Sequence, residues 1–265
     1  MSSSTSDGED EAGQELELDG HSEPERQLKL DHHNEPEQKL ELDHHSGPGQ
    51  ELNLGVAQEP GQGLNRGEVS PPRQAATVIL LRGGAQTLEV LLVKRTEQAK
   101  FMGGVWVFPG GAVDDDDPPS TVAGAVGAHR AAAARELSEE AGIVLADPSS
   151  LVEFSRWITP EEVSIRFDTR FFLAELPAGQ EPQVDGEECV DQGWFTPQGA
   201  LDAYAREEIL LVFPTIKHLE QLGAFPSMLE LLEYARGREV LPVQPKVWFD
   251  GEVARVALPG EPGYA

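Results

Sequence analysis

Apolar residues change in density along the chain, and the change divides it into two unequal parts. Over the first seventy or so residues they are sparse, no aromatic residue occurs, and Glu, Asp, Gln, Gly, Pro and His predominate. Such a segment buries too little apolar surface to offset the entropy lost on ordering. We therefore expect residues 1–72 to be a disordered acidic tail and residues 73–265 to form one domain, which is long enough for a sizeable core.

The tail contains a tandem repeat of twelve residues. The unit over residues 14–25 returns over 26–37 and 38–49, and more loosely over 50–61. Each copy places a Leu-x-Leu pair shortly before a Pro, which prevents a continuous helix. A unit this short and polar cannot stack into a solenoid, so the pattern predicts a low-complexity linker.

Apolar runs rich in β-forming residues begin immediately after the tail. Residues 75–82 and 87–95 are two such runs, and the Gly-Gly-Ala-Gln turn between them predicts a β-hairpin. A short strand over 105–108 then leads into Pro109-Gly110-Gly111, an abrupt turn where the backbone can approach a ligand closely.

Strands and helices alternate through the rest of the chain. The predicted strands lie over residues 152–158, 164–176 and 188–195. The predicted helices end at Gly142 or lie over 197–206, 214–222 and 226–235, and a short extended pair closes the chain at 246–249 and 253–258. Strands interleaved with helices around one mixed sheet predict an α/β sandwich.

The helix ending at Gly142 carries the strongest candidate for chemistry. Its alanines and unbranched residues favour helix, and Gly142 can adopt the positive φ that ends one. Glu136, Glu139 and Glu140 then share one face, at the end where the helix dipole disfavours negative charge. Oxygen ligands without Cys or His suit Mg²⁺ or Mn²⁺ rather than zinc. The alternative is a Glu-rich turn on a solvated surface.

The charge of the chain limits its partners. A net charge of −27 argues against nonspecific binding to nucleic acid or to an anionic membrane, because neutralising phosphates needs a basic patch. A phosphate-bearing small molecule fits if metal ions and a few local cations offset the repulsion.

Cys189 is the only cysteine, which excludes an internal disulfide and suits a reducing cytoplasm. No transmembrane run or signal peptide is recognisable, so we expect a cytoplasmic protein and leave homodimerisation open.

Two stretches of the chain form the halves of one motif: Gly110-Gly111 with the acidic loop that follows, and Arg135-Glu136-Leu137-x-Glu139-Glu140-x-Gly142-Ile143. Together they resemble a Nudix box, the signature of hydrolases that cleave a diphosphate joined to another group. The second half matches fully. In the first half Asp117 stands where the family pattern has Glu, and seventeen residues instead of seven separate it from Arg135. The resemblance implies a ten-residue insertion and leaves the role of Asp117 open.

The resemblance implies a Nudix-type α/β/α sandwich with a mixed sheet, and it assigns metal ligands. Glu139 and Glu140 would be the principal ligands of Mg²⁺ or Mn²⁺, and Glu136 a further ligand or a base. A carbonyl of Gly110 or Gly111 would complete the shell. Because a diphosphate presents crowded anionic oxygens, cations are needed to offset its charge and to acidify the attacking water.

Two further roles follow from the resemblance. Arg135 would orient the carboxylates rather than touch substrate. A later acid commonly supplies one more ligand or base, and we expect Glu188, with Glu187 next, although both fit ordinary surface acids. The implied catalytic set is Glu136, Glu140 and Arg135.

The likeness extends to a longer branch of the family that includes peroxisomal coenzyme A diphosphatases. It rests on Trp157-Ile158-Thr159-Pro160, on residues 166–172 and on Pro214-Thr215. Arg95 and Lys100 match the spacing of a coenzyme A submotif that ends in Phe-Pro-Gly-Gly, with Lys and Thr substituted, and would bind the adenosine-side phosphates. They could equally be strand-end surface charges.

Arg166 and Arg170 are a second pair of candidate substrate-binding cations. Four residues apart on a strand, they would share one face and could point into a phosphate pocket. They could instead pair with surface acids.

The resemblance implies a diphosphatase that hydrolyses a nucleoside diphosphate derivative. Coenzyme A or an acyl-CoA is the preferred substrate, with ADP-ribose, dinucleotides and nucleotide sugars as alternatives. A hypothesis of another class is a Nudix-fold protein that binds a nucleotide, or regulates, without turnover.

Overall fold

The computed structural model describes residues 69–99, 102–117, 126–250 and 253–264. The prediction of a tail therefore falls almost wholly outside the described residues, and so does Lys100. Among the helices of the described part, none is long and apolar enough to cross a membrane.

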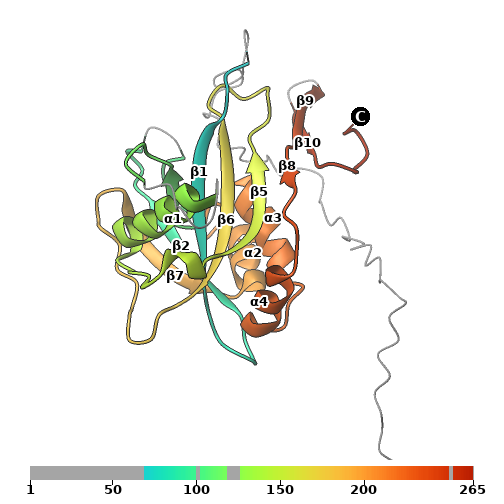
Figure 1. Cartoon of the computed structure of the whole chain (residues 1–265). Helices are drawn as coiled ribbons and strands as arrows, with labels where there is room; N and C mark the ends of the chain where they lie inside the picture. Colours follow the sequence, from blue (N-terminus) through green and yellow to red (C-terminus); the bar gives the residue numbers. More distant parts are fainter. Residues whose placement is uncertain (1–68, 100–101, 118–125, 251–252, 265) are drawn as a thin grey trace, which may run out of the picture. The chain divides into compact units, whose positions relative to one another are not determined.

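One mixed sheet organises the domain (Figure 1). Its strands are β1 (Arg73–Arg82), β2 (Glu89–Arg95), β3 (Trp106–Val107), β4 (Gly110–Ala112), β5 (Val152–Ile158), β6 (Phe167–Glu175), β7 (Cys189–Phe195) and β8 (Pro242–Val243). The main path runs β3-β2-β1-β6-β5-β8, while β4 pairs with β1 and β7 with β2. Because β1 is parallel to β6 but antiparallel to β2 and β4, the sheet is mixed, as predicted.

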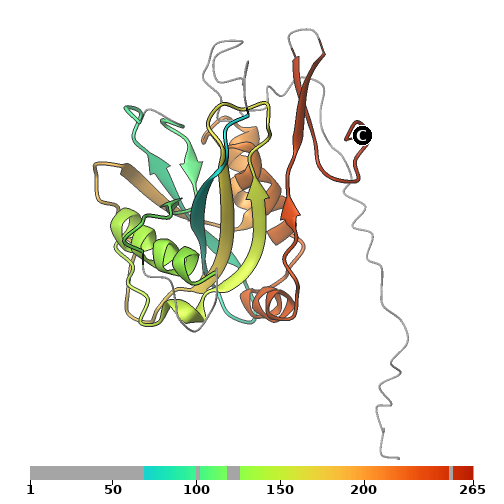
Figure 2. The same ribbon diagram turned by 45° about the horizontal axis from the view of Figure 1, so that its top comes forward.

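Helices cover both faces of this sheet (Figure 2). Against one face lies α1 (Val126–Ala141), and against the other lie α2 (Pro197–Ala205), α3 (Phe213–Leu222) and α4 (Met228–Arg236). The central strand shows why: Val78 and Leu80 join the core under α1, whereas Ile79 joins the core under α2 to α4. A strand buried on both faces reads as a continuous apolar run. The predicted α/β/α sandwich is confirmed.

The helix α1 ends where the sequence predicts. Gly142 has a φ of 66°, in the left-handed region that favours glycine, and its N–H donates to the Ser138 carbonyl at 3.1 Å. A Cβ at this position would lie 3.0 Å from the carbonyl oxygen of Gln183. The glutamates of α1 are therefore fixed in its last two turns, against a neighbouring loop.

Several boundaries differ from the prediction. Gly110 and Gly111, predicted as a turn, belong to β4 and pair with Thr77 and Ala76 of β1. The strand predicted from residue 164 begins at Phe167, and the last helix begins at Met228. A 3₁₀ turn, η1 (Pro148–Ser150), and β8 were not predicted, whereas the closing pair exists as β9 (Lys246–Asp250) and β10 (Val253–Ala257).

Candidate metal and diphosphate site

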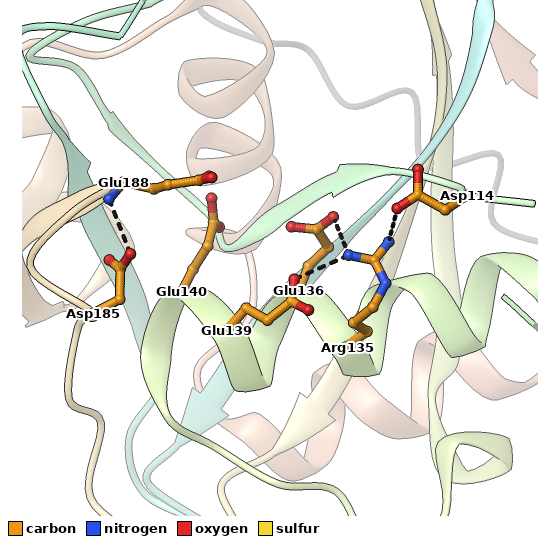
Figure 3. A pocket seen from close by; sticks show the side chains of 7 residues that line it. All are labelled: Asp114, Arg135, Glu136, Glu139, Glu140, Asp185 and Glu188. Atoms are coloured by element: carbon orange, nitrogen blue, oxygen red, sulfur yellow. Dashed lines mark hydrogen bonds and ion pairs between the residues drawn. The ribbon is translucent and has the colours of Figure 1, made fainter. Parts of the chain in front are cut away.

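A cavity of about 390 Å³ lies at the C-terminal end of α1 (Figure 3). Six carboxylates and one guanidinium line it, and we call it the acidic cavity. Its lining residues are Asp114, Arg135, Glu136, Glu139, Glu140, Asp185 and Glu188. The structure thus brings the three acids of the helix together with Glu188, which lies 48 residues beyond Glu140 in the sequence.

Strand β4 passes directly over two of the helix carboxylates. The Gly110 N–H donates to Oε2 of Glu140 at 2.8 Å. A Cβ on Gly111 would lie 2.4 Å from Oε1 of Glu136, so this carboxylate would have to move. A Cβ on Gly110 would lie 2.5 Å from the backbone carbonyl oxygen of Ala76, so glycine is required at that position, because the backbone of β1 cannot yield as a side chain can.

Arg135 holds the acidic cavity together and uses all its donors inside the protein. Its Nη1 donates to Oε1 of Glu136 at 2.8 Å and to Oε2 of Glu139 at 3.0 Å. Its Nη2 donates to the carbonyl of Ala112 at 3.0 Å, and Nε and Nη2 both donate to Asp117 at 3.1 Å. A guanidinium has five N–H groups, so none is left for a substrate.

Asp117 anchors Arg135, which answers the question that the sequence left open. Its carboxylate is buried, with 7% of the residue exposed, and accepts a bidentate pair from Arg135 and the Asp114 N–H. Burial alone would raise the pKa of Asp117, but these bonds hold it below its ordinary value. Of the seventeen residues between Asp117 and Arg135, those from Val126 to Ala134 belong to α1, and residues 118–125 lie outside the described ranges.

Burial and mutual repulsion disfavour the ionised form of two acids. The pKa of Glu140, which is 3% exposed, is raised to about 7 because burial desolvates it, and the charges of Glu136 and Glu188 add to the effect. The pKa of Glu136 is raised by burial in the same way, although Arg135 opposes this. Protein groups alone do not compensate the charge gathered here, so a cation would be favoured.

Glu188 is presented by a tight loop before β7. The carboxylate of Asp185 accepts the N–H groups of Glu188 and Cys189, both at 2.9 Å, and the Glu188 carbonyl accepts the Thr96 N–H at 2.8 Å. Figure 3 shows the side chain of Glu188 directed toward that of Glu140. Glu187, the second choice from the sequence, does not line the cavity.

The donors fit magnesium or manganese in kind, because the cavity offers carboxylate oxygens only. Arg135 donates to one carboxylate oxygen of Glu136 and to one of Glu139. The second oxygen of each carboxylate has no hydrogen bond to a described residue. Over the described ranges, no three His, Cys, Asp or Glu side chains are already arranged closely enough to hold a metal ion. Ion binding would therefore require these side chains to move closer together.

The predicted substrate-binding cations are not gathered at one place. Arg95 lies beside the acidic cavity, with Nη1 3.4 Å from Oε1 of Glu140. Arg166 donates to the carbonyls of Thr159 and Ser70, and Arg170 pairs with Glu153. Neither Arg166 nor Arg170 lines the acidic cavity. Arg166 precedes β6, so strand alternation does not extend to it, and Arg170 lies within β6 beside Glu153 of β5.

Sequence reasoning missed Asp114 and Asp185 as lining residues. Asp185 could have been found, since an Asp followed by Gly a few residues before a candidate ligand is a turn signal that can fix the ligand's backbone. Asp114 belongs to a run of four Asp residues, of which the motif spacing marks Asp117 alone.

Comparison with known proteins gives an independent view of the domain. The NUDIX domain model matches residues 71–214. The acyl-coenzyme A diphosphatase NUDT19 of Xenopus laevis is 24% identical over 244 residues, covering 57% of this chain and 64% of that protein. Human NUDT19, of the same name, is 32% identical over 91 residues, covering 34% of this chain and 24% of that protein. The chain thus spans less than two thirds of either relative.

A solved structure agrees with the fold. A NUDIX hydrolase from Alicyclobacillus acidocaldarius superposes with a TM-score of 0.55 at 27% identity, covering 63% of this chain and 97% of that one.

Proposed function

The chain belongs to the NUDIX family, and we propose that it is a metal-dependent hydrolase that cleaves the diphosphate bond of a nucleoside diphosphate derivative. The observation that carries the proposal is the acidic cavity, where six carboxylates meet a single guanidinium that is fully engaged within the protein. Water would add to one phosphorus while the bond to the bridging oxygen breaks, giving two phosphate monoesters.

Glu136, Glu139 and Glu140 would hold Mg²⁺ or Mn²⁺, with Glu188 and a carbonyl of Gly110 or Gly111 as further ligands. A bound ion would offset phosphate charge and acidify the attacking water. The chain's own contribution is positional. Arg135 keeps Glu136 and Glu139 in place, and β4 keeps Glu140 in place. Glu136 or Glu188 would accept the proton of the water.

Coenzyme A or an acyl-CoA is the preferred substrate. Two curated relatives are named acyl-coenzyme A diphosphatases, and Arg95 lies beside Glu140 of the acidic cavity, where it could meet a substrate phosphate. ADP-ribose, dinucleotides and nucleotide sugars are the alternatives within the same chemistry. We do not assign substrate contacts to Arg166 and Arg170, because neither lines the acidic cavity and each bonds to other residues.

The test is turnover of a substrate panel by the purified full chain with Mg²⁺. Coenzyme A, an acyl-CoA, ADP-ribose, a dinucleotide and a nucleotide sugar are each incubated, and products are followed by phosphatase-coupled phosphate release. We expect turnover that Glu140→Gln lowers about 100-fold or more, since it removes a buried ligand. Glu233→Gln, which changes an exposed acid on α4, should leave turnover unchanged.

The outcomes separate the hypotheses. Turnover of ADP-ribose with none of coenzyme A would reject the preferred substrate and keep the reaction. Binding of a nucleotide without turnover of any compound would reject the enzyme in favour of a non-catalytic nucleotide-binding protein.

A further inference from the structure

A second cavity, of about 430 Å³, shares no lining residue with the acidic cavity. Three arginines line it: Arg130 from α1, Arg236 from the last residue of α4, and Arg238 just beyond. We call it the arginine cavity. Its remaining wall comes from η1, the start of β5 and Ala235.

The three arginines are not neutralised by acids of the described domain. Arg82, Arg135, Arg156, Arg170 and Arg206 each pair with a carboxylate. Over the described residues, no carboxylate lies within 4.0 Å of the guanidinium nitrogens of the arginine cavity. This is unexpected in a chain with 47 acidic and 20 basic residues. The favourable place of Arg236 at a helix C-terminus explains one cation but not the convergence of three.

Contacts fix two of these side chains and leave N–H groups open. Arg130 donates from Nε to the Leu151 carbonyl at 3.2 Å, and its guanidinium carbon lies 5.8 Å from the ring centroid of Phe172. Its two terminal nitrogens have no partner among the described residues. Arg238 lies over the ring of Tyr234, 4.4 Å from its centroid, and donates Nη1 to the Tyr234 hydroxyl.

The other polar side chains of the wall already have hydrogen-bond partners, so they neither provide donors for an anion nor repel it strongly. Glu153, the only acid in the lining, is already bonded to Arg170. The Ser149 hydroxyl donates to the Asp147 carboxylate and the Ser150 hydroxyl to the Asp147 carbonyl. Guanidinium groups are therefore the available donors, and the lining has a net positive charge.

We propose that the arginine cavity binds a phosphate group, either inorganic phosphate or the terminal phosphate of a monoester. Planar guanidinium forks match the oxygens of a phosphate in pairs, and three of them around one cavity suit a dianion better than a monoanion. Nothing in this inference depends on turnover at the acidic cavity.

The experiment titrates inorganic phosphate into the full chain with EDTA present and ionic strength held constant with chloride. EDTA removes the divalent ions through which the acidic cavity could hold phosphate. Binding is followed by calorimetry and by ³¹P line broadening. We expect saturable binding with a dissociation constant of about 1 mM, weakened about tenfold or more in the double variant Arg236→Gln/Arg238→Gln. Both residues are exposed, so the variant should fold.

Arg206→Gln is the matched control, because Arg206 is an exposed arginine paired with Glu208 outside the cavity, and it should leave binding unchanged. Repeating the titration with a nucleoside monophosphate and with glycerol 3-phosphate tells whether an ester group adds affinity. Absence of saturation by about 10 mM phosphate, or equal binding by wild type and the double variant, would overturn the proposal.

Discussion

Each face of the sheet buries titratable groups, but their surroundings differ. On one face the buried group has hydrogen-bond partners for all its polar atoms, and on the other face it lies in a cluster of like charges. Under α2 to α4, His218 is fully buried and both ring nitrogens are bonded: Nδ1 donates to the Pro214 carbonyl and Nε2 accepts from the Ser155 hydroxyl, both at 2.6 Å. Under α1, Glu140 is almost equally buried and accepts from the Gly110 N–H and from Arg95, yet it stands among the like charges of the acidic cavity. A buried polar group that is fully bonded is structural, whereas an uncompensated cluster of one charge indicates a ligand site.

If buried His218 is structural, its removal should cause the largest loss of stability, and His218→Ala tests this. The His218 ring packs against the ring of Phe171 at a centroid distance of 4.1 Å, and its removal leaves a cavity and an unpaired Ser155 hydroxyl. We expect the free energy of unfolding in urea to fall by about 3–5 kcal/mol. Leu241→Ala, at a side chain that is 68% exposed, is the control and should change little. A loss below about 1 kcal/mol for His218→Ala would refute the structural role.

The next effect tests whether Asp117 acts on the site through Arg135. Asp117→Asn removes the charge that anchors the guanidinium, so we expect kcat/KM to fall about 10–100-fold and Mg²⁺ affinity to weaken. Asp117→Glu should recover part of the loss. Asp115→Asn, at an exposed neighbour, should not alter either quantity. Unchanged kinetics in Asp117→Asn would mean that Arg135 is held adequately by other groups.

His218 also makes stability depend on pH. Burial lowers its pKa from 6.5 to about 4, so the folded state resists protonation. The stabilisation is complete above pH 6.5 and is lost as pH falls toward 4. Between about pH 7.5 and about pH 5 we expect a loss of about 2 kcal/mol from this group. The double variant Ser155→Ala/His218→Phe should lack this component, and parallel curves for both proteins would contradict it.

The smallest effect concerns the end of α1 that positions the glutamates. Gly142→Ala forces a side chain into left-handed backbone close to Gln183, and we expect thermal unfolding to report a loss of about 1 kcal/mol. Gly237→Ala is the matched control, since Gly237 has a negative φ and no atom within 4 Å of an added Cβ. Equal stability of the two variants would show that the turn is not constrained.

Local sequence patterns were enough to predict much of the fold. The strand and helix periods predicted most elements, and Gly142 predicted the end of α1, because each depends on residues close in sequence. The strand β4 was not predicted, since glycines have low strand propensity and Gly110 and Gly111 pair with β1 through backbone alone. The parallel pairing of β1 with β6 is likewise absent from any local pattern.

The sequence predicted those site residues that lie on one helix, where spacing fixes the face. It did not predict the contacts that depend on how separate segments pack together. Glu136, Glu139 and Glu140 share a helix face, which spacing alone dictates. The pair between Asp117 and Arg135 was hidden by the insertion, because spacing across a loop does not report distance. Arg166 was expected to lie on a strand but precedes it, so its side chain bonds backbone carbonyls instead.

The most direct test of the central claim is thermal unfolding of wild type and Glu140→Gln at about pH 8, with EDTA and then with Mg²⁺. If the acidic cavity is an uncompensated ligand site, Glu140→Gln without metal is more stable than wild type by about 1 kcal/mol, because it removes a buried charge. Mg²⁺ then stabilises wild type but not the variant. A wild type that is indifferent to Mg²⁺, together with a variant that is less stable than wild type in EDTA, would contradict the account.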